Sequence, residues 1–262
     1  MSAASACLAL FERDVMAVTR SRSQLYSTML TPLLFLVFLG TGVSRGLEPS
    51  SLPAGNYTAY LVAGVVVMTA VFSSTFSSAS YYRDRDSGLL RMLLSSPLGA
   101  RWLLLGKSLA GVTIGVSQAV VVLAVAAPFV DFEWQYGVVR GLAISFAAIL
   151  LLNVMLGGVA QAVATRITSM QGFHLVMNLV LFPLLFFSGA FFPVANLPTW
   201  LEVLAYLNPL SYAVDAMEVA TYADSSEGFI GLGIDFAVLG VLAAAVYALG
   251  LSRVPRLSWS GK

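Results

Sequence analysis

The stretch that decides the fold covers residues 83–107 and reads RDRDSGLLRMLLSSPLGARWLLLGK. It holds five of the fourteen basic residues of the chain, and long apolar runs flank it on both sides. Charges of this density do not rest in lipid, so we expect residues 83–101 to form a cytoplasmic loop between two membrane helices. Leu89, Leu90 and Leu93 recur at helical spacing around Arg91, which predicts a short amphipathic helix over residues 88–95.

The composition around this loop is that of an all-α integral membrane protein. Hydrophobic residues make up 58% of the 262 residues and charged residues only 10%, whereas soluble domains carry roughly 25% charged residues. The net charge of +1 gives no reason to expect a nucleic-acid partner, and one cysteine excludes an internal disulfide. We expect one membrane domain over residues 1–262 and no soluble domain.

The amino-terminal segment, residues 1–24, is predicted to be a cytoplasmic helix that lies in the membrane interface. Leu8, Phe11, Val15 and Val18 recur three or four residues apart, so they share one helical face, and charged residues occupy the rest. An ordinary polar tail is the alternative interpretation of the same residues.

Six apolar runs are each long enough, at about 1.5 Å per helical residue, to cross a hydrocarbon core of about 30 Å. The predicted spans are residues 25–44, 58–82, 102–127, 138–164, 170–192 and 229–251.

The distribution of charge orients these spans. With both termini inside, twelve basic residues lie on the inner side and two on the outer side, while the acidic residues divide four to nine. Basic residues favour the cytoplasmic side. We therefore expect a multi-pass membrane protein with both termini in the cytoplasm.

Residues 193–228 lie outside in this topology and yet are apolar. Two short helices are predicted there, at 198–206 and 209–222, and Asn208 followed by Pro209 is typical of a helix start. Both are too short to span, so we expect an extracellular re-entrant hairpin between the fifth and sixth spans; a flat extracellular cap is the alternative. The residues assigned to the hairpin are Pro193, Pro198, Trp200, Asn208, Pro209 and Tyr212.

The chain shows no residue pattern of an enzyme. Gly106-Lys107-Ser108 imitates the end of a phosphate-binding loop, but Arg101 occupies the position of the required first glycine. Ser188 and His174 lie on one predicted helix about 21 Å apart, too far for catalysis. We therefore expect neither catalysis nor a cofactor or metal in this chain. No charged residue lies in the middle of a span, which disfavours a proton-driven transporter.

Two sequence patches resemble those of a known family. The central loop combines acidic and basic residues, Gly88, a leucine-rich turn, Ser96-Pro97 and LGK at 105–107. The second patch contains FSGAFFP at 187–193, LPTWL at 197–201 and NPLSYA at 208–213. Together with the order of spans, these patches resemble the type-2 (ABC-2) permeases, the half-size membrane subunits of ATP-binding-cassette exporters of drugs, lipids and polysaccharides.

The resemblance implies an exporter in a prokaryotic cell membrane. Its ATP and Mg²⁺ would be bound by a separate ABC ATP-binding subunit, and a second copy or a homologous permease would be its membrane partner. The alternative is an ATP-independent channel or secondary carrier, for which we would expect inverted repeats with broken helices. By the resemblance, the residues that contact the ATP-binding subunit are Arg83, Asp84, Arg85, Asp86, Ser87, Gly88, Leu89, Leu90, Arg91, Leu93, Phe11 and Arg13.

Overall fold

The computed structural model describes residues 3–44, 57–94, 100–130, 132, 134, 136–194, 198–221 and 230–253. Every regular element in these ranges is a helix, which confirms the all-α prediction for this part of the chain. In chain order the elements are α1 Ala3–Arg20, α2 Arg22–Ser44, α3 Tyr57–Ser77, α4 Ala79–Asp86, α5 Leu89–Leu94, α6 Ala100–Ala126, the 3₁₀ turn η2 Ala127–Phe129, α7 Val138–Ala164, α8 Met170–Phe186, α9 Thr199–Leu207, α10 Pro209–Thr221 and α11 Leu232–Arg253.

Five helical segments of the described chain are long and apolar enough to cross a membrane: Leu25–Gly42, Tyr57–Asp86, Leu104–Phe129, Val138–Ala164 and Leu232–Leu249. The predicted fifth span was drawn too long, because α8 has only 17 residues and ends at Phe186. The apolar run continues to residue 192, but α8 is capped at Phe187, and Gly189, with a left-handed φ of 87°, then turns the chain.

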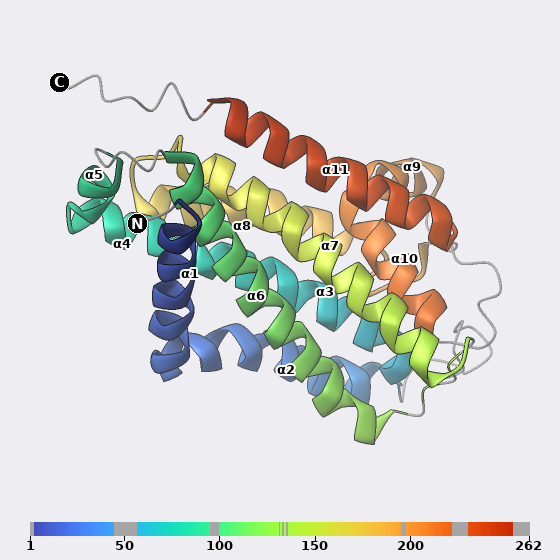
Figure 1. Ribbon diagram of the computed structural model, residues 1–262. Coiled ribbons are helices and arrows are strands. Elements are labelled where there is room, and N and C mark those ends of the chain that lie inside the picture. Colours follow the sequence, from blue (N-terminus) through green and yellow to red (C-terminus); the bar gives the residue numbers. More distant parts are fainter. Residues whose placement is uncertain are drawn as a thin grey trace.

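Helix α3 forms the centre of the bundle (Figure 1). In the span Tyr57–Asp86, which begins with α3, 89% of the residues are buried. In the spans of α2 and α11 the buried shares are only 22% and 17%, so these helices present apolar faces outward. Helices α2, α6, α7 and α10 all contact α3, and α11 packs on α7 and α10. The core of the molecule is therefore one continuous apolar cluster around α3.

The two ends of the bundle carry different elements. In Figure 1, α4 and α5 project at the left-hand end and α1 runs across that end, while α9 and α10 lie at the opposite end. The chain is still helical at 83–86, where we predicted a loop, because α4 continues α3 after a turn at Ser78. The predicted amphipathic helix is present as α5, and Gly88, with a φ of 76°, makes the turn into it. Residues 95–99 of the predicted loop lie outside the described residues.

Asn208 joins the two short helices of the opposite end as predicted. Helix α10 begins at Pro209, and the Asn208 Oδ1 atom accepts a hydrogen bond of 3.0 Å from the Leu210 N–H. The Asn208 amide also donates to the carbonyl of Leu184 on α8, and the Tyr212 hydroxyl donates to the carbonyl of Tyr206 at 2.7 Å. These bonds fasten α9, α10 and the end of α8 to one another. Pro193 is half-buried, whereas Pro198 and Trp200 are exposed.

Candidate functional site

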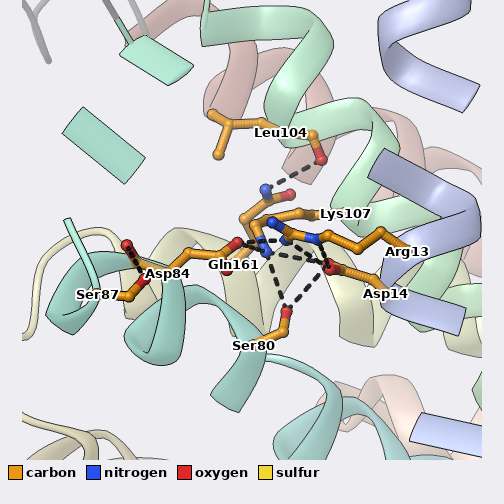
Figure 2. Close-up of polar contacts among 8 residues, drawn as sticks. All are labelled: Arg13, Asp14, Ser80, Asp84, Ser87, Leu104, Lys107 and Gln161. Carbon is orange, nitrogen blue, oxygen red and sulfur yellow. Dashed lines mark hydrogen bonds and ion pairs between the residues drawn. The ribbon is translucent and has the colours of Figure 1, made fainter. Parts of the chain in front are cut away.

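Four charged side chains from three helices meet at the end of the bundle that carries α5 (Figure 2). Arg13 and Asp14 come from α1, Asp84 from α4 and Lys107 from α6; we call these residues the ion cluster. The Lys107 ammonium lies 3.0 Å from the Asp14 carboxylate and 2.5 Å from that of Asp84. The Arg13 guanidinium lies 2.7 Å from Asp14 and 2.5 Å from Asp84. Each cation therefore bridges both carboxylates.

The ion cluster is almost shielded from solvent. The side chains of Lys107, Asp14 and Asp84 are 5%, 6% and 11% exposed, and that of Arg13 is 36% exposed. Two positive and two negative charges balance, which makes burial tolerable, and the Ser80 hydroxyl bridges Lys107 and Asp14. Burial by itself raises the pKa of Asp14, but the charges and hydrogen bonds of Lys107 and Arg13 outweigh it and hold that pKa below the usual carboxyl range.

Gly106 explains how α1 comes close enough to α6 to complete the ion cluster. A Cβ atom at this position would lie 2.8 Å from the Cys7 carbonyl oxygen of α1, closer than carbon and oxygen pack. The next residue is Lys107, which reaches past the point of contact to Asp14. The Gly-Lys pair that imitates a phosphate-binding loop is therefore a helix-packing contact followed by an ion pair.

A polar layer continues from the ion cluster into the bundle. The Ser108 hydroxyl donates to Gln161 on α7, and the Gln161 amide donates to the Leu104 carbonyl at 3.1 Å. A cavity of about 30 Å³ adjoins these groups and is lined by side chains that include Ser77, Lys107 and Asn153. Helices α3, α4, α6 and α7 all contribute to this layer, so the ion cluster is connected to the centre of the bundle.

The outward side of the same end is formed by the turn between α4 and α5. Arg83, Asp86, Ser87 and Gly88 are exposed, Leu89 is half-buried, and Met92 is 64% exposed. The Arg85 guanidinium is exposed as well and donates to the carbonyl of Thr168, between α7 and α8, at 3.1 Å. This exposed surface lies directly beside the ion cluster.

The structure divides the predicted partner-contact residues into two groups. Asp84 and Leu90 lie inside the chain, whereas Arg13 is paired within the ion cluster and remains 36% exposed. The second group forms or adjoins the outer surface: Arg83, Arg85, Asp86, Ser87, Gly88 and Leu89 there, with Phe11 half-buried on α1. The side chains of Arg91 and Leu93 lie outside the described part of the structure.

Asp14, Ser80 and Lys107 were missed as candidate residues. One signal was present in the sequence. A lysine inside an apolar run needs a carboxylate partner, and Asp14 lies at the spacing of the apolar face of its helix, three residues after Phe11 and four before Val18. The partner itself lies 93 residues away, and no local pattern identifies it.

Comparison with known proteins agrees with this architecture. Residues 5–222 match the family model described as ABC-2 type transporter. The chain is 31% identical to the ycf38 protein of Pyropia yezoensis, whose description names a transport permease, over 79% of this chain and 70% of the relative. It is 26% identical to nodulation protein J of Neorhizobium galegae over 81% of this chain and 80% of the relative.

A third relative, YbhR of Escherichia coli strain K12, is described as a multidrug ABC transporter permease and is 25% identical over 66% of this chain but only 46% of YbhR. The match to the family model covers more than half of the chain and includes all four residues of the ion cluster. The chain is a multi-pass membrane protein and belongs to the ABC-2 type transporter family.

Proposed function

We propose that this chain is the permease of an ATP-driven exporter in a prokaryotic cell membrane. It moves a hydrophobic or amphipathic substrate, a drug, lipid or glycan, out of the cytoplasm or the inner leaflet. A separate ABC ATP-binding subunit binds and hydrolyses ATP with Mg²⁺, and a second copy of the chain or a homologous permease completes the membrane part. The family membership supports this role, and the observation that carries the mechanism is the ion cluster.

The ion cluster converts movement of the outer surface into movement of the bundle. The α4–α5 turn is exposed and available to a partner, whereas Asp84, on the same α4 helix, is bound to α1 and α6. Force applied to α4 and α5 therefore reaches α6 through ion pairs and α3 through the turn at Ser78. ATP-dependent closure of the partner then tilts the helices as nearly rigid bodies.

The membrane topology proposed here has six spans, with α8 as the fifth. Its 17 residues reach about 25 Å as a helix, somewhat less than the hydrocarbon core, and a short span is accommodated by local thinning of the bilayer. Helices α9 and α10 form a re-entrant hairpin at the outer side, in which α10 packs against α3, α7 and α11. Both termini are cytoplasmic. The apolar outward faces of α2 and α11 meet lipid or the second permease.

The exposed residues of the α4–α5 turn provide the test. We expect Asp86→Lys and Met92→Asp to abolish co-purification with the ATP-binding subunit and ATP-driven export, because both change an exposed surface without touching the ion cluster. Glu202→Lys, on α9 at the opposite end, is the matched control and should leave binding of the ATP-binding subunit intact. Thermal unfolding of each variant checks that the fold is retained.

Two results would contradict the proposal. One is normal co-purification and export by the Asp86 and Met92 variants. The other is solute movement by the purified chain alone in liposomes that contain neither nucleotide nor a second type of subunit.

A further inference from the structure

Two buried aspartates lie together where α10 meets α11, at the end of the bundle opposite the ion cluster. Asp215 on α10 is 2% exposed and Asp235 on α11 is fully buried. One oxygen of Asp215, Oδ2, accepts hydrogen bonds from the N–H groups of Ile230 and Gly231 at 2.9 and 3.1 Å. The Asp235 N–H donates to the Gly231 carbonyl at 3.1 Å. Asp215 therefore lies against the first turn of α11, the turn that carries Asp235.

The Asp235 carboxyl group has no hydrogen-bond donor in the described structure. Both of its oxygens are buried and neither is reached by a protein N–H or O–H group. The Asp215 carboxyl lies beside it, because Asp215 binds the N–H groups that lead into the turn carrying Asp235. A carboxylate that has lost both water and donors is unstable, so such a group takes up a proton or binds a cation. A hydrogen bond between two carboxyl groups requires a proton on one of them.

The surroundings indicate which aspartate carries the proton. Asp215 accepts two backbone N–H groups, which stabilise a carboxylate, whereas Asp235 has no such donor. A metal ion is disfavoured because no group of three His, Cys, Asp or Glu side chains that could hold one exists among the described residues.

The other ionisable groups on the helices packed around this pair do not replace the proton. Glu218, half-buried one turn further along α10, is another carboxyl group and supplies no positive charge to Asp215 or Asp235. Arg140 is the charged residue of α7 and is exposed. Glu202 is the charged residue of α9 and is half-buried. On α3, the hydroxyls of Tyr57 and Tyr60 donate to the carbonyls of Phe191 and Gly189.

We propose that the Asp235 carboxyl group is protonated and that its O–H group donates a hydrogen bond to the Asp215 carboxylate. This carboxylic acid–carboxylate pair holds the last membrane span against α10. The bound proton is the ligand of this site. Its loss would place two negative charges side by side in a buried position, and repulsion would separate α10 from the start of α11. The proposal concerns only this chain and holds whether or not the chain is an exporter.

Infrared spectroscopy of the purified protein at neutral pH provides the direct test. A protonated carboxyl group gives a C=O band distinct from the bands of carboxylates. We expect this band in the unmodified protein, its loss in Asp235→Asn, and its retention in the control Glu202→Gln. Loss of the band in Glu218→Gln with retention in Asp235→Asn would assign the proton to Glu218 and overturn the proposal.

Thermal unfolding separates a proton from a metal cation. We expect Asp235→Asn to melt close to the unmodified protein, because the amide N–H₂ can donate to Asp215 as the acid did, and Asp235→Ala to melt clearly lower. Removal of sodium and of divalent cations should leave the melting temperature of the unmodified protein unchanged. Absence of the carboxylic-acid band in the unmodified protein, or a melting temperature that falls on removal of cations, would overturn the proposal even if a variant failed to fold.

Discussion

Lys107 connects α6 to both α1 and α4 at the end of the bundle that carries the ion cluster. It lies within an apolar helix, at a position where a positive charge is costly, and its ammonium is held by Asp14, Asp84 and Ser80. Breaking a buried ion pair by removing one partner leaves an uncompensated charge, and that is more harmful than removing both charges together.

We expect Lys107→Ala to lower the free energy of unfolding by about 3–5 kcal/mol, because Asp14 and Asp84 would then share only Arg13. Denaturant unfolding of the purified protein measures the change. Arg83→Ala, at an exposed position on α4, is the matched control and should have little effect. The double variant Asp14→Leu/Lys107→Met removes one charge of each sign and should be less damaging than Lys107→Ala; the opposite order would contradict the role of charge balance.

The packing of α1 against α4 and α6 should persist in acid until the pH falls below about 4. The pKa of Asp14 is lower in the folded chain than its ordinary value near 4, so its ion pairs contribute fully above that pH and are lost only as the pH falls through the lower folded value. Cys7 is the one cysteine of the chain and is buried on α1, so its reaction with a dithiodipyridine, which labels thiols in acid, reports undocking.

The labelling rate of Cys7 should therefore stay low from neutral pH down to about pH 4 and rise below it. Asp14→Asn should label faster at neutral pH and show a smaller acid-dependent increase. A steep rise in labelling of the unmodified protein between pH 6 and pH 5 would exclude Asp14 as the controlling group.

At the scale of elements, α3 holds the turn that follows α8 by a very close backbone approach. A Cβ atom at Gly64 would overlap the carbonyl oxygen of Ala190, and the hydroxyls of Tyr57 and Tyr60 donate to carbonyls of the same turn. The FSGAFFP patch is thus conformationally fixed by α3, and Gly64 is the residue that permits the contact.

Gly64→Ala should therefore destabilise the protein by about 1–3 kcal/mol or more, because backbone atoms of the turn must move to relieve the overlap. Gly240→Ala is the matched control: it also lies within a membrane helix, but nothing approaches its Cβ position within 4 Å. Measured melting temperatures should fall for Gly64→Ala and be unchanged or slightly raised for Gly240→Ala. Equal effects of the two substitutions would show that the close approach does not matter.

Elements whose limits are set by local residues were predictable from the sequence. Helix α7 has the predicted bounds, Val138–Ala164, since Gly137 precedes it and a polar turn follows. Asn208 and Pro209 also marked the start of α10 correctly. The end of α8 was missed because residues 187–192 are as apolar as a helix would be, and only the backbone shows that Gly189 turns the chain.

The candidate site was predictable only in part, because its inward half depends on contacts between distant residues. The charges at 83–86 and the short helix after them could be read from the sequence. The sequence does not show that the Asp84 side chain is buried while Asp86 is exposed. The burial of Asp84 depends on Arg13, 71 residues away, and on Lys107 in another helix.

The whole molecule has one end rich in charge and one end that buries acidic groups. The ion cluster and the α4–α5 turn lie at the first end, and α9 and α10 lie at the other (Figure 1). Twelve of the fourteen basic residues fall on the inner side of the proposed topology. The proposed topology places the two ends on opposite sides of the membrane.

We expect impermeant maleimides to distinguish the two ends in a Cys7→Ala background. Thr199→Cys, at the exposed start of α9, should be labelled in intact cells, and Ser87→Cys, in the α4–α5 turn, only in inverted vesicles. Labelling of both positions from the same side would contradict the topology with six spans.

The separation of the ion-cluster residues along the chain has a consequence for biosynthesis. Asp14 leaves the ribosome long before Lys107, 93 residues later, has been made. Until then the first helix has no counter-charge on α6 and no surface at Gly106 to rest on. The packing of α1 against α6 must therefore occur late, after α6 has been synthesised. A newly synthesised chain cannot form the complete ion cluster until that step has occurred.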